Sequence, residues 1–174
     1  MRDAATVKGL ANAAYSSGDY ATAADLGDEL VRLDPDDVIG WQIRANSRIF
    51  ALRHEEALAA CDDAIEALER ICGGGGGSIF VGTDPRPGMY FNRACVEAKL
   101  GRREPALESL RMAVRGVEKF AAMAAEDDYF ESLYDDPEFR AIVAGDVRAL
   151  RTGDEREPGG VRRLLARARA CATG

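Results

Sequence analysis

The chain has 174 residues, of which 47% are hydrophobic and 30% are charged, a composition typical of a folded soluble domain. Its net charge of −7 disfavours nucleic-acid binding by the main body, because contact with phosphates needs a basic face. No window reaches membrane-spanning length and the N-terminus lacks an apolar stretch of signal-peptide length, so we expect a cytoplasmic protein without membrane contact.

The first two stretches of the chain repeat each other. Residues 7–35 and 41–69 carry small residues at a constant offset of 34, as Ala11 and Ala45 illustrate. Within each copy, apolar residues recur at the i, i+3, i+4, i+7 spacing of one helix face, before and after a short polar turn. The first copy stops at "DPDD", where Pro35 cannot continue a helix. Each copy therefore predicts two antiparallel helices joined by a turn.

A third copy follows after an insertion. In residues 90–114, Ala94 lies 49 residues beyond Ala45, and other small residues keep the same offset. The 15 residues in excess of 34 fall at 72–86, which contain the run "GGGGG". We predict a Gly-rich inserted loop between the second and third copies.

The glycine run lacks the pattern of a phosphate-binding loop. A Walker-type loop needs a lysine directly after its last glycine, and no lysine occurs between Gly73 and Lys99. A dinucleotide fingerprint follows a strand, whereas a predicted helix precedes this run, and Ser78 stands where the third glycine should be. Loops of this length inside compact folds are often functional, so contact with a small ligand stays open.

The three copies resemble the tetratricopeptide repeat (TPR) family, whose 34-residue repeats are helix pairs. The matching residues are Ala23 and Leu30 in the first copy, Trp41, Ala45, Ala57 and Ala64 in the second, and Tyr90, Ala94, Ala106 and Ala113 in the third. The resemblance implies an all-α fold, a right-handed superhelical array of three TPR helix pairs with a C-terminal helical cap. It sets the array at 4–125, with repeats at about 4–37, 38–71 and 87–120.

Three positions depart from the family pattern. Arg44 and Arg93 replace an apolar helix residue, and we expect their stems to pack while their guanidinium groups reach neighbouring carboxylates. Gly27 lies inside a predicted helix where the family has a large apolar group, and a glycine there costs about 1 kcal/mol relative to alanine. We expect Trp41 of the next copy to fill the space beside Gly27.

Residues 126–150 predict short helices that cap the array, because a terminal repeat otherwise exposes its apolar stacking face. Asp136 followed by Pro137 is typical of a helix start. The expected apolar contacts of the cap are Phe130, Leu133, Phe139 and Ile142. This segment resembles the closing motif that follows repeat groups in many bacterial proteins of the family. Residues 151–174 predict a polar linker and a basic C-terminal helix or tail, suited to an acidic partner, nucleic acid or the acidic body itself, or simply a solubilising tail.

No catalytic or metal-binding set emerges from the sequence. His54 lies in a predicted turn without a neighbouring nucleophile or orienting partner. The four cysteines have no C-x-x-C spacing, and a single histidine cannot complete a zinc quartet. The acidic clusters flank prolines at helix boundaries, where capping explains them. We therefore expect no enzyme, no metal and no cofactor.

One face of the first helix of each copy is expected to point away from the core. By helical phase, its partner-binding residues are Lys8, Asn12, Tyr15, Gln42, Asn46, Ile49, Phe50, Phe91 and Lys99. Stacked together, these side chains would line a concave groove of mixed polar and aromatic character, suited to an extended peptide or a helix. The plain alternative is an ordinary solvated helix surface.

Part of this face resembles the carboxylate clamp of the family, which holds the acidic C-termini of cytosolic heat-shock chaperones. Lys8 and Asn12 match two clamp members. The other clamp positions fall on Ile43, Gly88 and Asn92, which cannot supply the same amide and cations. A complete clamp is therefore not expected.

These observations favour a non-catalytic protein–protein interaction module or adapter that binds a peptide or helical segment of a partner in its groove. The alternative is a ligand-sensing regulatory protein in which the loop 72–86 closes over a small molecule. The identity of the partner and the oligomeric state, a homo-oligomer included, are left open by the sequence.

Overall fold

The computed structural model describes residues 2–73, 84–146 and 148–150, and within these ranges the chain is all-helical. The helices are α1 (Ala4–Ser16), α2 (Tyr20–Leu33), α3 (Val38–Phe50), α4 (His54–Gly73), α5 (Arg86–Lys99), α6 (Arg103–Gly116), α7 (Lys119–Glu126), the 3₁₀ helix η1 (Asp128–Leu133) and α8 (Pro137–Val143). The expected all-α class is confirmed.

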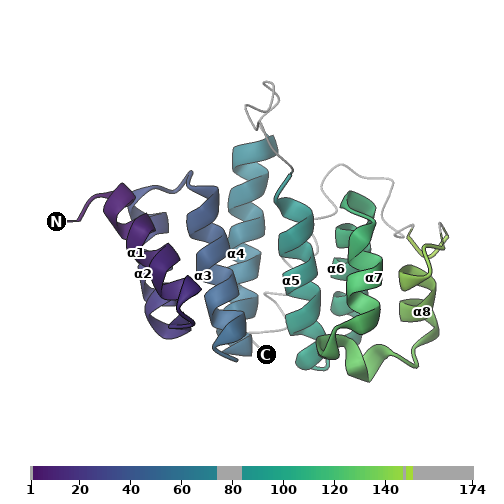
Figure 1. The fold of residues 1–174 in the computed structure, drawn as a ribbon. Helices are drawn as coiled ribbons and strands as arrows, with labels where there is room; N and C mark the ends of the chain where they lie inside the picture. The colour runs from purple at the N-terminus through teal and green to yellow at the C-terminus, as the bar shows by residue number, and fades with distance from the viewer. Residues whose placement is uncertain (1, 74–83, 147, 151–174) are drawn as a thin grey trace, which may run out of the picture.

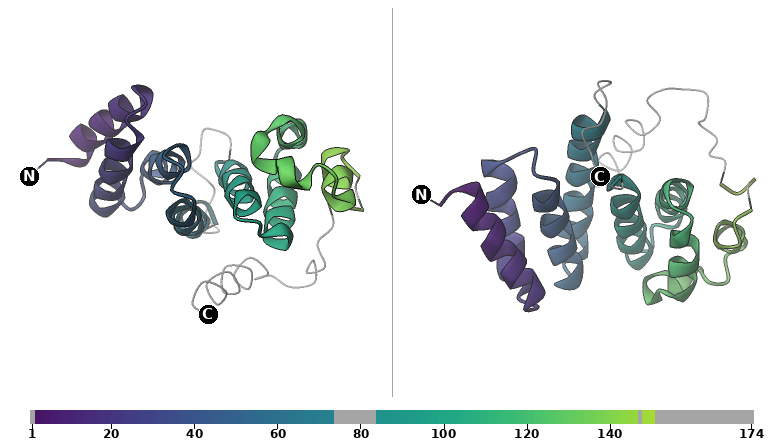
Figure 2. Two further views of the ribbon diagram at one scale, coloured as in Figure 1. Left: turned by 90° about the horizontal axis from the view of Figure 1, so that it is seen from below. Right: turned by 45° about the horizontal axis from the view of Figure 1, so that its top comes forward.

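The helices form antiparallel pairs that follow one another in a row (Figures 1 and 2). Helix α1 packs on α2, α3 on α4, and α5 on α6, while α2 contacts α3 and α4 contacts α5 across the junctions between pairs. The first helices of the pairs also contact one another, α1 with α3 and α3 with α5. They therefore lie side by side along one side of the row.

The turn inside each helix pair has the same backbone conformation at one position. One residue in each turn adopts a positive φ, 80° at Gly18, 58° at Leu52 and 70° at Gly101. These positions are related by the offsets of 34 and 49 residues found in the sequence. The repeat register is thus visible in the backbone, with leucine replacing glycine in the second pair.

Both inter-pair junctions contain an arginine–aspartate bond. The Nε atom of Arg44 donates to Oδ1 of Asp28 over 2.8 Å, and that of Arg93 donates to Oδ1 of Asp62 over 2.7 Å. The two arginines are 49 residues apart and the two aspartates 34 apart, so equivalent positions meet at both junctions. This confirms that the arginine head groups reach neighbouring carboxylates.

The space beside Gly27 is filled differently from the expectation. A Cβ atom added to Gly27 would lie 2.9 Å from both Cα and N of Arg44. The backbone of α3, and not the ring of Trp41, therefore occupies this space, and the expectation for Trp41 was wrong. Trp41 instead donates from Nε1 to the carbonyl oxygen of Pro35 over 2.9 Å.

Helices α7 and α8 and η1 close the end of the row that is opposite the N-terminus (Figure 1). Helix α8 packs on α6 and α7, and η1 packs on α5. The Oδ1 atom of Asp136 accepts from the backbone amides of Glu138 and Phe139, which confirms the predicted helix start at Pro137. The four expected apolar contacts, Phe130, Leu133, Phe139 and Ile142, are all buried.

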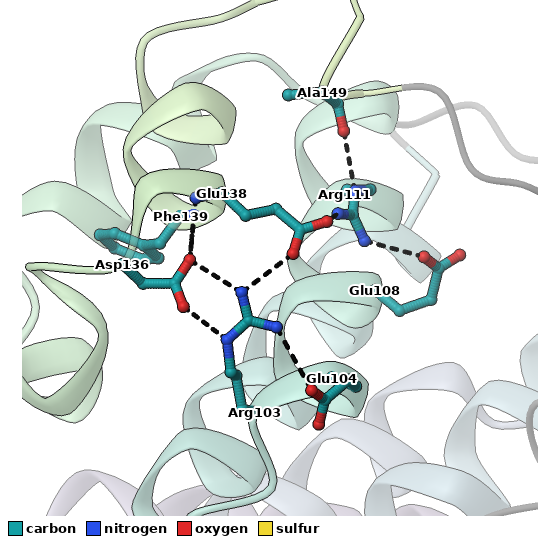
Figure 3. A network of polar contacts seen from close by, with 8 residues as sticks. All are labelled: Arg103, Glu104, Glu108, Arg111, Asp136, Glu138, Phe139 and Ala149. Carbon is teal, nitrogen blue, oxygen red and sulfur yellow. Dashed lines mark hydrogen bonds and ion pairs between the residues drawn. The ribbon is translucent and has the colours of Figure 1, made fainter.

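Two arginines of α6 bind this closing segment (Figure 3). Arg103 pairs with Asp136 at 2.5 Å and with Glu138 at 3.1 Å. Arg111 also pairs with Glu138, and its Nε donates to the carbonyl oxygen of Ala149 over 2.8 Å. These contacts fix α8 and the described chain end on α6.

Several expectations concern residues outside the described ranges. They include most of the inserted loop 72–86 and the linker and basic tail at 151–174. In the described part of the chain, no helix is long and apolar enough to cross a membrane. Cys61, Cys72 and Cys95 are free thiols.

Candidate partner-binding face

The predicted binding residues lie on the neighbouring first helices of the three pairs, which we call the α1–α3–α5 face. The structure separates them into accessible and covered residues. Asn12, Phe50 and Lys99 are exposed, whereas Lys8, Tyr15, Gln42 and Asn46 are half-buried and Ile49 and Phe91 are buried. The face is therefore open at α1 and α3 and largely closed at α5.

An aromatic cluster lies on the open part of the face. The ring of Phe50 stacks on Tyr20 with a centroid distance of 5.1 Å and meets the edge of Tyr15 at 6.0 Å. Tyr15 and Tyr20 contact each other edge to face at 5.6 Å. Phe50 remains 53% exposed although it contacts both rings. The cluster therefore offers a rigid aromatic surface to solvent.

A bond between two amide side chains lies on the same face. The Oδ1 atom of Asn46 accepts from Nδ2 of Asn92 over 2.6 Å. This bond links α3 to α5. Partial burial raises the pKa of Tyr15, which keeps its hydroxyl protonated and able to donate. Amides and a hydroxyl in this arrangement suit a peptide backbone.

The two residues that match the carboxylate clamp are engaged within the molecule. The Nζ atom of Lys8 donates to Oδ2 of Asp37 over 2.7 Å, a contact that joins α1 to the start of α3. The Nδ2 atom of Asn12 donates to the backbone oxygen of Lys8. Ile43, at a third clamp position, is buried. The charge of Lys8 is thus already paired, which argues against recognition of a terminal carboxylate here.

The closing segment covers the third pair. Phe91 stacks on Phe120 of α7 at 4.8 Å and meets Phe130 of η1 at 5.8 Å, which leaves it 5% exposed. Lys99 donates from Nζ to the carbonyl oxygen of Asp128 over 2.8 Å. Phe91 therefore packs inside the fold and is not accessible to a partner. The ammonium of Lys99 is hydrogen-bonded to η1. The sequence expectation for these residues did not anticipate that η1 packs on α5.

Ile49 is also covered, with 7% of its side chain exposed. Its carbonyl oxygen accepts a bond of 3.4 Å from the hydroxyl of Tyr129, a residue of η1. Gln42 is half-buried on the face. The sequence reading missed Tyr20 and Asn92 as members of the face. Tyr20 is the first residue of α2, and its contact with Phe50 depends on how α2 and α3 pack.

The described residues contain no group of His, Cys, Asp and Glu that could hold a metal ion. Burial raises the pKa of the Cys61 and Cys95 thiols strongly, so neither is present as a reactive thiolate at neutral pH. His54 meets the ring of Tyr129 edge to face at 6.0 Å, and its Nδ1 is buried without a hydrogen-bond partner among the described residues. An aromatic contact of this kind fits a packing role.

Comparison with known proteins does not identify a family for this chain. No family model matches the chain, and no curated protein or solved structure matches it. The TPR resemblance therefore depends on the sequence positions given above, and function has to be argued from the geometry of the face.

Proposed function

We propose that this protein is a non-catalytic interaction module, a TPR-like superhelical array that binds a peptide or helical segment of a partner protein across α1 and α3. The observation that carries the proposal is the aromatic cluster of Tyr15, Tyr20 and Phe50, in which Phe50 is 53% exposed, together with the amide pair of Asn46 and Asn92. Aromatic residues in a fixed arrangement make strong anchors at interfaces, and adjacent amides can bond to a peptide backbone.

The usable face is shorter than three repeats would provide. Because η1 and α7 cover Phe91 and engage Lys99, a partner would contact the first two pairs and end near η1. Two neighbouring helices, each about 10 Å wide, together present a width of about 20 Å, so a segment of about four helical turns or about six extended residues spans α1 and α3.

The experiment places a photocrosslinking amino acid at Phe50 in the intact protein and, in a matched control, at Leu33, an exposed apolar residue of α2. We expect the Phe50 position to crosslink a specific protein in the native cell extract and Leu33 to give none. The purified partner should then bind Phe50→Ala about tenfold more weakly, while Leu33→Ala binds like the wild type.

Equal binding by Phe50→Ala, or crosslinks only from Leu33, would contradict the proposal. The ligand-sensing alternative makes a different prediction. In that case a screen of metabolites should raise the melting temperature of the protein without any protein partner, and changes in the loop 72–86 should abolish the shift.

A further inference from the structure

The turns at one edge of the molecule expose apolar side chains beside unpaired acids. This edge contains the α1–α2 and α3–α4 turns and η1, which lie along the bottom of the row in Figure 1. We call it the turn edge. Its apolar members are Tyr15, Tyr20, Phe50, Leu52 and Tyr129, and its acidic members are Glu126, Asp127, Asp128 and Glu131.

Leu52 is an unusual choice for its position. It is 69% exposed and has a φ of 58°, whereas the equivalent turn residues, Gly18 and Gly101, are glycines. A leucine in the left-handed region destabilises the fold by about 1–2 kcal/mol. Because the side chain is exposed, the burial of apolar surface within the described residues does not offset this cost. Strained residues of this kind often mark sites that contact another group.

The four acidic residues stand out because most other carboxylates are neutralised. Arginines pair with carboxylates at both junctions between the helix pairs and at the start of α8, as at Asp28, Asp62 and Asp136. None of the four acids of the turn edge has an ion pair among the described residues. All four belong to the end of α7, the residue that follows it and η1. Desolvation, and after it the negative charge of these four residues, raises the pKa of the Tyr134 hydroxyl.

Tyr129 joins the acidic and apolar parts of this edge. It lies between Asp128 and the α3–α4 turn, where its hydroxyl reaches the carbonyl oxygen of Ile49 and its ring meets His54. Phe50 and Leu52 belong to the same turn region, so Tyr129 connects this turn to η1, with Nζ of Lys99 5.3 Å from the centroid of its ring. Such a surface fits a segment that carries both apolar and positively charged side chains.

Residues 161–174, which lie beyond the described chain, have this chemistry. They contain four arginines and no acid, and without these arginines the net charge of −7 would be −11. Val161, Leu164, Leu165 and Ala168 follow the i, i+3, i+4, i+7 spacing of an amphipathic helix. The arginines, Arg162, Arg163, Arg167 and Arg169, fall on the other side of the same helical projection.

We propose that residues 161–174 dock on the turn edge of the same molecule, with the apolar stripe on Phe50, Leu52 and Tyr129 and the arginines beside the carboxylates of η1. Lengths are compatible with this contact. A helix of 14 residues spans about 21 Å, and α1 and α5, one helix apart, lie about 20 Å from each other. The ten residues 151–160 reach up to about 35 Å when extended, well beyond the length of α6, on which the described chain ends.

The test uses Cys171 of the full chain as the site of a nitroxide spin label. Cys61 and Cys95 are buried, and Cys72→Ser removes the remaining thiol, so the label is confined to the tail. We expect the nitroxide to broaden the amide signals of Leu52, Asp128 and Glu131 in low salt, and 1 M salt to weaken this broadening because the ion pairs are screened. Amide signals in the middle of α2 should be unaffected.

Charge-reversal variants identify the contact. Asp128→Lys with Glu131→Lys should remove most of the broadening, whereas the control Asp25→Lys on the exposed side of α2 should retain it. Arg163→Glu with Arg167→Glu repeats the test from the tail and leaves the folded body unaltered.

The proposal is overturned if the nitroxide broadens no signals of the turn edge, or if both double variants keep the broadening. It is equally overturned if the signals broaden only when isotope-labelled protein is mixed with a separate spin-labelled copy, which would place the tail on a second molecule. The inference shares Phe50 with the proposed partner-binding face but needs no external partner. Failure of tail docking therefore leaves the crosslinking experiment unaffected.

Discussion

The N-terminal helix pair and the rest of the row differ in the size of their hydrophobic cores. The first pair packs around a separate cluster of six residues, five of its own, Val7, Ala11, Ala23, Leu26 and Leu30, and Ile43 of α3. A larger cluster runs continuously from α3 through the closing helix α8. The same repeat pattern thus produces a small core at one end and an extended core over the rest.

The two junctions show the same contrast. The side chains of Arg44 and Asp28 are 19% and 44% exposed, whereas those of Arg93 and Asp62 are 2% and 10% exposed. Arg93 also pairs with Glu97 at 3.1 Å. Equivalent residues therefore form a partly solvated pair at the first junction and a buried network at the second. Burial, rather than the identity of the pair, determines how much each contributes.

The largest expected effect comes from truncation of the buried arginine. Arg93→Ala leaves Asp62 and Glu97 buried without their cation, and we expect a loss of about 3–5 kcal/mol in the free energy of unfolding. Arg44→Ala should cost only about 1 kcal/mol, because water can solvate Asp28. Urea denaturation of both variants measures the difference. Equal losses would show that the two junctions are energetically alike.

The buried network also predicts a pH dependence. Burial raises the pKa of Glu97 to about 7, since Arg93 is shared with Asp62 and the remaining partner is the Ser109 hydroxyl. The folded protein therefore holds this proton more tightly than the unfolded chain. The resulting stability is complete below about pH 4.5 and is lost as pH rises to about 7.

Glu97→Gln should flatten this dependence. We expect wild-type protein to lose more unfolding free energy between pH 5 and pH 7.5 than the variant, as followed by urea denaturation at each pH. Parallel profiles would mean that Glu97 does not titrate in this range in the folded protein.

A smaller effect is expected where α2 and α3 touch. Gly27→Ala would place a methyl group 2.9 Å from the α3 backbone, so the helices must separate, at a cost of about 1–3 kcal/mol. Gly9→Ala on α1 is the matched control, because no atom lies within 4 Å of its added Cβ, and it should stabilise by about 0.5–1 kcal/mol. Thermal melting compares the two. If Gly27→Ala leaves the melting temperature unchanged, α2 and α3 are less closely packed at Gly27 than the structure shows.

The smallest effect concerns the turn of the second pair. In the background of Arg163→Glu with Arg167→Glu, which removes the proposed tail contact, Leu52→Gly should stabilise the protein by about 1 kcal/mol, because the positive φ costs a glycine nothing. Gly101→Ala, at the equivalent turn, should destabilise it by a similar amount. If Leu52→Gly destabilises, the side chain makes a contact that the described residues do not include.

Much of the fold was predictable because its signals are local or recur along the chain. Asp136 before Pro137 and the apolar stripes each depend on a few neighbouring residues, and the offsets of 34 and 49 residues relate one repeat to the next. The reach of Arg44 and Arg93 was also predictable, since a long charged side chain at a buried position needs a partner. The space beside Gly27 was not, because the closeness of two helix backbones depends on how they cross.

The binding face was predictable only in part. Of the residues that helical phase assigned to the face, Tyr15 and Phe50 are in contact with each other. Helical phase could not show that η1 folds back onto α5 and covers Phe91, because that contact joins residues far apart in the chain. Helical phase describes which way the side chains of one helix point. Whether another element covers those side chains depends on how the whole chain packs.

Native-state hydrogen exchange of the full chain tests the contrast between the two ends most directly. The account predicts that the most protected amides of α1 and α2 exchange through a partial opening, with a free energy below that of α4, α5 and α6, because a small core and a solvated junction hold the first pair. Equal free energies across all these helices, each matching global unfolding, would contradict it.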